Sequence, residues 1–244
     1  MRPWISAAAA AALLAAAPIG AFAQRAGSTS PAASAVPPAR SAGLGDAAPG
    51  APAEAAAAPA DARTETPEAA IERLYRALVE AAGAGGVEER YRRLDPVVAA
   101  THDLPYIAEL TIRRQWDSLT PDQRQRFVDA FQRLSVMTYA SRFGALKPGM
   151  LEVTHGERAG DDRAQVEATL TTASGEVIPF EYLLHETDGG WKIINILADN
   201  VSDLALKRAE YREVLEKGGV EDLIRHVEQQ ADDAARGGEV KYRK

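Results

Sequence analysis

The sequence predicts an α+β domain in which helices flank and cover a strongly curved antiparallel sheet. Apolar residues recur at helical spacing from residue 67 to about residue 143, and again after residue 202. Between residues 150 and 198 the spacing changes to the alternation that is typical of half-buried antiparallel strands. Helices, a four-stranded meander and helices again form the order of an α+β domain, whose bent sheet can form a cone with its mouth covered by helices.

The first residues have the pattern of an export signal. Residues 1–23 combine a weakly basic start, an apolar run too short to span a membrane, and the small-x-small pattern Ala21-Phe22-Ala23. They predict a cleaved signal peptide, with an uncleaved inner-membrane anchor as the alternative. Residues 24–66, rich in Ala, Pro, Gly and Ser, predict a disordered, extended tether. Residues 67–235 are then the folded domain, and residues 236–244 are a flexible tail.

Two helices are predicted at the start of the domain. Thr66 and Pro67, followed by an acidic residue, supply a capping hydroxyl and a proline at the first helical position. The glycines between Gly83 and Gly86 end this helix. A second helix is predicted from Val87 to about Ala100, with Pro96 as a kink or break.

Two further helices precede the sheet. One is predicted from Asp103 to Trp116, where apolar residues recur on one stripe. The other begins with Thr120-Pro121-Asp122-Gln123, which is a capping box with proline at the first helical position. Its apolar residues continue toward Phe143, so this helix is predicted to be long.

Four strands are predicted after the helices. Met150 to His155 is expected to supply the first, and Arg163 to Thr172 alternates between polar and apolar residues. Gly175 begins the third, and Asp188-Gly189-Gly190 turns it into the fourth, which runs from Trp191 to Ala198.

The fourth strand is expected to be apolar on both faces. Its two alternating sets are Trp191, Ile193 and Leu197 on one face, and Ile194, Ile196 and Ala198 on the other. Two helices then close the chain, Ser202 to Lys217 and Val220 to about Ala235, parted by Gly218-Gly219.

Composition narrows the classes of function. The formal net charge of −7 argues against a nucleic-acid partner and against docking on anionic lipid by bulk charge. The absence of cysteine excludes disulfides, thiol catalysis and cysteine-ligated metals. The four histidines are scattered without the spacing of a metal site. His102 has an acidic neighbour, Asp103, and this pair is interpreted as an exposed loop with Asp103 as a helix cap, rather than as a catalytic dyad.

Two pairs of basic residues are candidates for contact with a head group. Arg113 and Arg114 lie beside Trp116, where one guanidinium could hold a phosphate. The alternative is a solvated helix face with an arginine stem lying over the indole. Lys207-Arg208 in the C-terminal helix admits the same two interpretations.

Aromatic and aliphatic side chains are the remaining candidates for function. Phe127, Phe131 and Tyr139 on the long helix are expected to face the aromatic and aliphatic residues of the sheet. Two interpretations stay open at this point. The set forms an ordinary packed core, or it encloses a dry apolar slot that accepts an apolar guest.

Several motifs resemble a known family. The segments Leu104 to Trp116, Leu119-Thr120-Pro121-Asp122-Gln123-Arg124 and Phe127 to Tyr139 resemble the MlaC-type, or toluene-tolerance, family. The stretch from Ile196 to Tyr211 looks most similar to the HpnM branch, which is associated with hopanoid biosynthesis. Asn200 stands where the family often has glycine.

The resemblance implies a fold and an activity. The fold is expected to be related to the NTF2-like cone, and the activity to be carriage of lipid without any bond being made or broken. The expected ligand is phospholipid or a hopanoid-type lipid, the expected partner a membrane transport complex of the ABC type, and the expected compartment the periplasm. No cofactor is expected. The doubly apolar fourth strand is expected to offer one face to the lipid.

Two groups of residues are expected to contact the lipid. The head group is assigned to Arg113 and Arg114. The apolar slot is assigned to Tyr106, Leu110, Phe127, Phe131, Leu134, Tyr139, Val166, Leu170, Phe180, Tyr182, Leu184, Ile194 and Ile196.

Two alternatives remain. NTF2-like cones also host isomerases and dehydratases, but the expected interior carries Tyr182 without an evident acid, because Glu181 falls on the other face. The other alternative is a scaffold or adaptor, which predicts a completely filled core and a protein partner.

Overall fold

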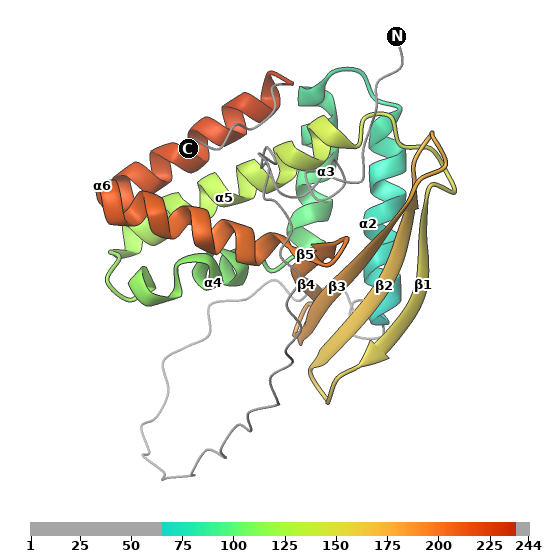
Figure 1. Ribbon diagram of the computed structural model, residues 1–244, viewed down its shortest axis with the longest axis horizontal. Coiled ribbons are helices and arrows are strands. Elements are labelled where there is room, and N and C mark those ends of the chain that lie inside the picture. Colours follow the sequence, from blue (N-terminus) through green and yellow to red (C-terminus); the bar gives the residue numbers. More distant parts are fainter. Residues whose placement is uncertain (1–64, 238–244) are drawn as a thin grey trace, which may run out of the picture.

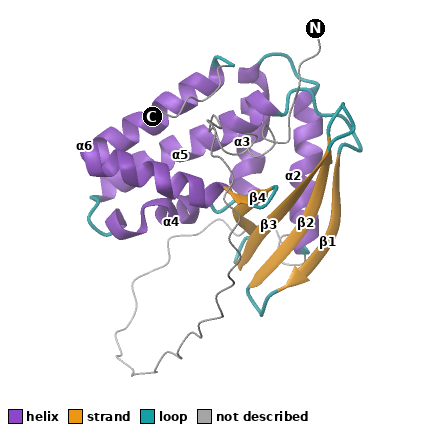
Figure 2. Ribbon diagram, in the orientation of Figure 1, coloured by secondary structure: helices purple, strands orange, loops and turns teal. Residues whose placement is uncertain are grey.

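The computed structural model describes residues 65–237. The predicted signal peptide, the predicted tether up to residue 64 and the tail from residue 238 lie outside the described residues. Within them, one antiparallel sheet packs against a group of helices (Figures 1 and 2). This arrangement confirms the predicted α+β class, in which helices before and after the sheet cover one of its faces. The sheet is open rather than closed into a barrel.

The helices begin where the capping signals predict. Thr66 Oγ1 accepts a hydrogen bond from the Ala69 amide at 3.2 Å. Thr120 and Gln123 form the reciprocal capping box, with N–H···O distances of 3.2 and 3.1 Å. The described helices are α2 (Pro67–Ala82), α3 (Val87–Thr101), α4 (Leu104–Trp116), α5 (Pro121–Arg142) and α6 (Asp203–Ala235).

Two helical details concern proline and glycine. Helix α3 continues through Pro96, so of the predicted kink or break at this residue the break is wrong. Helix α6 is a single element with a sharp bend at Gly219, whose φ of 71° and ψ of −166° are outside the helical region. A left-handed φ of this kind strains any residue with a Cβ. The bend separates the two predicted C-terminal helices, which are seen in Figure 1 as two arms folded back at one end of the molecule.

The sheet has one more strand than predicted. Its order is β1-β2-β3-β4-β5, with neighbours antiparallel. Asp199 and Asn200, with φ of 51° and 64°, make the two-residue turn between the last two strands, and two positive φ values are typical of a type I′ hairpin. Asn200 therefore occupies a conformation that glycine also favours. The strands are β1 (Leu151–Arg158), β2 (Arg163–Thr171), β3 (Val177–Thr187), β4 (Gly190–Ala198) and β5 (Val201–Ser202).

Strand β4 is not apolar on both faces, contrary to the prediction. Its register with β3 shifts between the pairs Leu183–Asn195 and Leu184–Ile193. A bulge of this kind adds one residue and reverses the alternation beyond it. The four residues Trp191, Ile193, Ile196 and Ala198 consequently share the buried face, although two belong to each predicted set. Leu197 pairs with Glu181 and lies on the opposite face.

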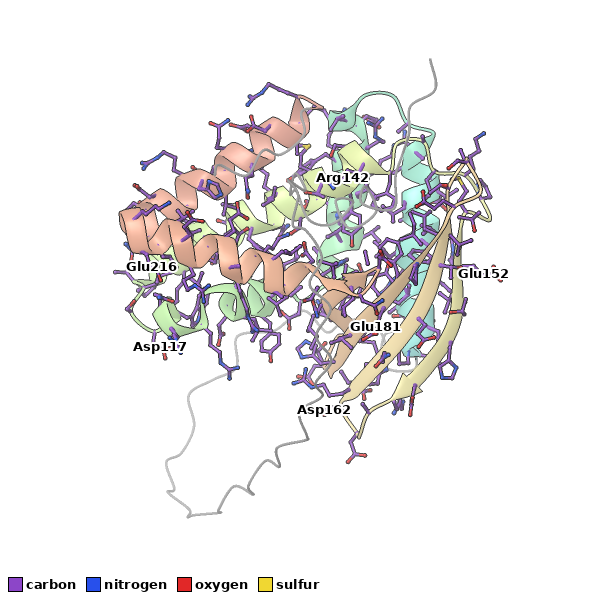
Figure 3. The ribbon with its side chains drawn as sticks, viewed as in Figure 1. Asp117, Arg142, Glu152, Asp162, Glu181 and Glu216 are labelled. Atoms are coloured by element: carbon purple, nitrogen blue, oxygen red, sulfur yellow. The ribbon has the colours of Figure 1, made fainter. Side chains whose placement is uncertain are left out.

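The core lies between the buried face of the sheet and the helices. Helix α2 contacts β1, β2 and β4, and the Tyr75 hydroxyl donates to the Tyr182 hydroxyl at 2.9 Å. Burial raises the pKa of both phenols, so both remain protonated. Charged side chains such as Glu152 on β1 and Glu216 on α6 project from the exposed surface (Figure 3). Helices α3, α4 and α6 also contact β4.

Candidate functional site

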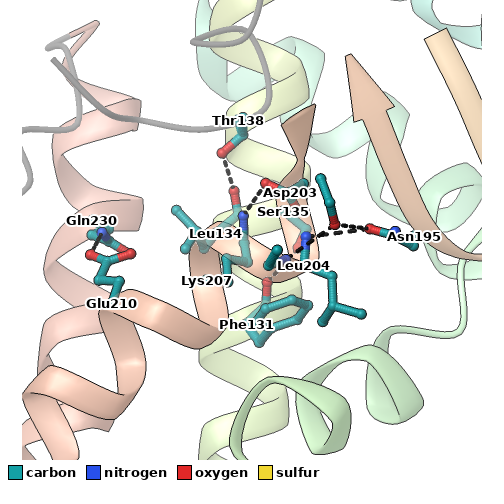
Figure 4. Close-up of polar contacts among 12 residues, drawn as sticks. Phe131, Leu134, Ser135, Thr138, Asn195, Asp203, Leu204, Lys207, Glu210 and Gln230 are labelled. Atoms are coloured by element: carbon teal, nitrogen blue, oxygen red, sulfur yellow. Dashed lines mark hydrogen bonds and ion pairs between the residues drawn. The ribbon is translucent and has the colours of Figure 1, made fainter. Parts of the chain in front are cut away.

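A pocket with a mainly apolar wall lies where α4, α5, β4 and the start of α6 meet. Its volume is about 50 Å³. Figure 4 shows the part of its wall that α5 and α6 supply. The lining residues are His102, Leu104, Ile107, Phe131, Leu134, Ser135, Thr138, Tyr139, Ile193, Ile194, Asn195, Ile196, Asp203, Leu204 and Lys207.

Helix α5 supplies one continuous wall of the pocket. Its contributing residues are Phe131, Leu134, Ser135, Thr138 and Tyr139. These positions follow the i, i+3, i+4, i+7, i+8 spacing that places side chains on one helical face. The hydroxyls of Ser135 and Thr138 donate to the helix carbonyls of Phe131 and Leu134, both at 2.8 Å. Two small polar residues can therefore stand in this wall without an unsatisfied hydroxyl hydrogen.

The junction of α3 and α4 is fastened to β4 beside the pocket. His102 forms a parallel bridge with Ile193, and the Asp103 amide donates to the Ile193 carbonyl at 3.0 Å. Asp103 Oδ1 accepts from the Tyr106 amide at 3.1 Å, which confirms the predicted cap of α4. The bulge of β4 lies at the same place, and Ile193, Ile194 and Asn195 of that strand all line the pocket.

A second link holds the start of α6 against β4. The side-chain oxygen of Asn195 accepts from the Ser202 hydroxyl at 3.1 Å and from the Leu204 amide at 3.3 Å. Ser202 also caps α6, accepting from the Ala205 amide at 3.1 Å. A single amide side chain thus places the first turn of α6 over the pocket (Figure 4).

His102 is buried, contrary to the predicted exposed loop. Its Nδ1 lies 3.2 Å from the Val98 carbonyl and 3.0 Å from Thr101 Oγ1, whose hydrogen is donated to Val97. Both neighbours are acceptors, so Nδ1 carries the ring hydrogen and Nε2 accepts from the Tyr139 hydroxyl at 3.0 Å. Burial lowers the pKa of His102 to about 4. The imidazole is therefore neutral at physiological pH, and burial keeps the Tyr139 phenol protonated by raising its pKa.

Stability is expected to fall as pH falls from about 6.5 toward 4, because the unfolded state protonates the His102 imidazole first. Between pH 7.5 and pH 5 this one group accounts for a loss of roughly 2 kcal/mol in the free energy of unfolding. Urea unfolding at the two pH values measures the loss in the wild type and in a His102→Gln variant. Gln is expected to reduce the pH dependence by that amount, while His155→Gln, at an exposed histidine of β1, leaves it unchanged. Equal pH dependence in all three proteins contradicts the assignment.

Asp203 and Lys207 supply the formal charges in the described pocket wall. They are one helical turn apart on α6, and Lys207 Nζ lies 2.7 Å from Asp203 Oδ1. The Lys207 side chain is only 12% exposed, and the Asp203 side chain is only 18% exposed. The neighbouring Arg208 lies outside the wall and donates from Nε to the Leu110 carbonyl of α4 at 2.7 Å. Of the pair Lys207-Arg208, only the lysine reaches the pocket.

The structure separates the residues predicted to form the apolar slot. Five of them line the pocket, namely Phe131, Leu134, Tyr139, Ile194 and Ile196. The others lie elsewhere in the fold, namely Tyr106, Leu110, Phe127, Val166, Leu170, Phe180, Tyr182 and Leu184. Tyr106 stacks on His185 with ring centroids 5.0 Å apart, and the five sheet residues of this second group face the packed core. Whether any of these residues contacts lipid stays a prediction.

The predicted head-group arginines are exposed and stand apart from the pocket wall. Arg113 and Arg114 lie in the last turn of α4, whereas the pocket contacts its first turn. The arginine that lies over Trp116 is Arg124, whose guanidinium carbon is 5.4 Å from the ring centroid and whose Nε donates to the Trp116 carbonyl. Neither predicted arginine forms that contact.

Several lining residues were missed by sequence analysis. Ser135 and Thr138 follow the same helical spacing as the apolar residues of α5, so the spacing alone identifies them. Asp203 has the i, i+4 spacing of a helical ion pair with Lys207, which had been named together with Arg208 as a candidate for contact with a head group. His102 and Asn195 carry no such local signal, because their place depends on how α4 and α6 pack against β4.

Two further properties of residues 65–237 bear on the class of protein. Within this range, acidic, histidine and cysteine side chains form no group of three or more that could hold a metal ion. No helix in the same range combines the length and the apolar character required to cross a bilayer.

The fold is an α+β architecture that is also found in a phospholipid-binding protein of Ralstonia solanacearum, solved in complex with a phospholipid. The two structures superpose with a TM-score of 0.61 over 69% of this chain and 96% of the other, at 20% identity. The sequence gives the family directly: residues 68–229 match the family described as MlaC protein, and the chain belongs to that family.

A curated relative agrees with this assignment. The toluene tolerance protein Ttg2D of Pseudomonas putida is 26% identical over 145 residues, which is 59% of this chain and 66% of the relative. The matched part therefore falls slightly short of two thirds of that relative's length. The closer likeness to the HpnM branch stays a prediction.

Proposed function

We propose that this chain is a periplasmic lipid carrier. The pocket between α4, α5, β4 and α6 holds the apolar part of a phospholipid or hopanoid-type lipid, and the loaded protein exchanges it with a membrane transport complex of the ABC type. The observation that carries this proposal is a largely apolar pocket in a member of the MlaC family. The phospholipid bound to the solved protein of the same fold supports it.

Burial of hydrocarbon supplies the binding free energy of such a carrier. Each buried methylene contributes about 0.8 kcal/mol, so a dozen contribute on the order of 10 kcal/mol, which competes with the lipid's place in a bilayer. A cavity of about 50 Å³ holds only a few water molecules. Loading therefore requires the walls of the pocket to separate, and the walls best placed to do so are the helices, because β4 is held within the sheet.

Lipid recovery and lipid uptake test the proposal. The full chain is purified without added lipid and its organic extract is analysed by mass spectrometry. The delipidated protein is then mixed with vesicles that contain a fluorescent-tailed phospholipid and separated from them. We expect bound lipid in the extract and saturable uptake from the vesicles. An empty extract together with no uptake contradicts the proposal, and a stable protein partner recovered instead favours the scaffold alternative.

The enzyme alternative requires a free acid or base in the pocket. His102 and Asp203 line it and are the candidates. Both nitrogens of His102 already have hydrogen-bond partners, and Asp203 is paired with Lys207. A proton-transfer role would break these contacts. We therefore propose that the chain carries lipid without altering it, which recovery of chemically unchanged lipid after incubation tests.

A further inference from the structure

The mouth of the pocket lies between α5, β4 and the start of α6. The lining residues that keep some contact with water mark it, namely Ser135 and Thr138 on α5, Ile194 and Asn195 on β4, and Asp203 and Lys207 on α6. The other lining residues are buried. An acyl chain that enters at this mouth therefore passes the first turn of α6.

Helix α6 consists of two arms that are joined at Gly219 (Figure 1). Residues 203–218 are the first arm, which borders the mouth, and residues 220–235 are the second arm. The φ of 71° and ψ of −166° at Gly219 interrupt the helix, and the residue is exposed with open space beside it. Because glycine has no Cβ, its backbone angles can change without a steric clash. A junction of this kind can serve as a hinge between rigid elements.

The second arm is fixed to α5. Glu221 pairs with Arg126 of α5 at 3.0 Å, and Asp232 pairs with Arg133 at 2.6 Å. The arm also contributes a continuous row of side chains to the protein interior. Its buried residues are Leu223, Ile224, Val227, Gln230, Ala231 and Ala234.

The first arm buries much less and is held largely by polar contacts. Its buried residues are Leu204 and Tyr211. Arg208 Nε donates to the Leu110 carbonyl of α4 at 2.7 Å, and the Leu204 amide donates to the Asn195 side chain of β4 at 3.3 Å. Polar contacts near the surface can exchange with water at little net cost, whereas a buried apolar face cannot. The first arm is therefore easier to displace than the second.

Glu210 joins the two arms. Its Oε1 accepts from His226 Nε2 at 2.6 Å and from Gln230 Nε2 at 2.7 Å, and both donors belong to the second arm (Figure 4). Its Oε2 is buried and has no hydrogen-bond partner among the described residues. A buried carboxylate oxygen without a partner is unfavourable, and movement of the arm would expose it to water. This clamp therefore closes the arms without making the closed state very stable.

The length of the first arm amplifies a small change at Gly219. At 1.5 Å per residue, Tyr211 lies about 12 Å along the helix from Gly219, and Asp203 lies about 24 Å from it. A tilt at Gly219 thus moves the end beside the pocket about twice as far as it moves Tyr211. The mouth widens while the contact between Tyr211 and Phe127 of α5 shifts by less.

We propose that the first arm of α6 is the gate of the pocket and that Gly219 is its hinge. The arm tilts away from α5 and β4 to admit an acyl chain and returns when the chain is in place. The gate rests on the proposed carrier function, of which it names the moving wall. Asn195 acts as a latch, because its side chain holds Ser202 and Leu204 at the end of the arm that moves furthest.

Cross-linking in this cysteine-free chain tests the gate. Glu210→Cys combined with Gln230→Cys joins the two arms at a point outside the pocket wall. Arg133→Cys combined with Asp232→Cys joins the second arm to α5 and is the matched control. Each delipidated full-length variant is treated with a short, reducible bis-thiosulfonate cross-linker, and intact mass confirms complete reaction. The initial rate of uptake of a fluorescent-tailed phospholipid from vesicles is measured before cross-linking, after it, and after reduction.

Joining the arms is expected to lower the initial rate of uptake by roughly tenfold or more, because the arm can no longer tilt. Reduction of the same sample is expected to restore the rate, which shows that the cysteine substitutions themselves do not abolish uptake. The control variant is expected to keep its rate in all three states, because the second arm stays on α5.

The outcomes separate the gate from the carrier function. An unchanged rate in fully cross-linked Glu210→Cys/Gln230→Cys overturns the gate and leaves the carrier function standing, and so does an equal loss of uptake in the control. No uptake by the wild type overturns both. If the arm variant does not fold, hydrogen exchange of the wild type decides. Faster exchange of amides in residues 204–218 than in residues 220–235 supports the gate, and equal protection overturns it.

Discussion

Replacing Ser135 with phenylalanine is expected to reduce lipid uptake at least tenfold while changing the free energy of unfolding by no more than about 1 kcal/mol. Ser135 is half-buried in the α5 wall, and the space beside it is about 50 Å³. A phenyl ring directed into that space occupies the volume that an acyl chain needs. The uptake of fluorescent phospholipid from vesicles and the urea unfolding curve measure the two quantities.

A second serine on the same helix provides the control. Ser141 is also half-buried, and its hydroxyl also donates to a helix carbonyl, that of Thr138, at 3.1 Å. It does not line the pocket. Ser141→Phe is therefore expected to keep wild-type uptake. If Ser135→Phe takes up lipid as well as the wild type does, lipid binds somewhere other than this pocket.

Truncating Phe127 to alanine is expected to lower the free energy of unfolding by about 3–5 kcal/mol. Phe127 is fully buried, with its ring centroid 6.0 Å from that of Tyr211 on α6 and 6.3 Å from that of Phe131. The substitution leaves a cavity where α5 and α6 pack together, outside the pocket described above. Uptake per folded molecule is therefore expected to be unchanged.

Phe131 offers the matched comparison, because it is one turn further along α5 and lines the pocket. Phe131→Ala enlarges the pocket and is expected to take up lipid at least as fast as the wild type does. Denaturant unfolding and vesicle uptake distinguish the two variants. Loss of uptake in folded Phe127→Ala places Phe127 in the lipid site after all, as the sequence analysis expects. If Phe127→Ala lowers the free energy of unfolding by less than about 1 kcal/mol, the residues around Phe127 have moved to close the cavity.

The polar contacts of the pocket suit a carrier that must also release its ligand. Most of them are already made within the protein, as in the Asp203–Lys207 pair and the His102–Tyr139 hydrogen bond. A head group therefore gains little by displacing them, and the affinity comes mainly from apolar contact. On the proposed carrier function, such affinity is expected to suffice for loading from a bilayer and to be lost when the walls of the pocket separate.

The sequence by itself determined most elements of this protein and their order. The capping hydroxyls of Thr66 and Thr120 begin helices where predicted, and the alternation along Arg163–Thr171 gives the observed buried face of β2. These signals are local, because a cap or an alternating pattern acts within a few residues of chain. The order and spacing of motifs between Leu104 and Tyr139, and again from Ile196 to Tyr211, were also sufficient to indicate the MlaC family, which the match over residues 68–229 establishes.

Only the tertiary structure decided where the pocket lies and what lines it. The bulge at Ile194 joins two residues from each apolar set of β4 on one face, and the docking of α4 on that strand buries His102 beside Tyr139. Phe127 and Phe131 have the same chemistry on the same helix, yet one packs against α6 and the other lines the pocket. Such outcomes depend on contacts between residues far apart in the chain, whose packing no local pattern encodes.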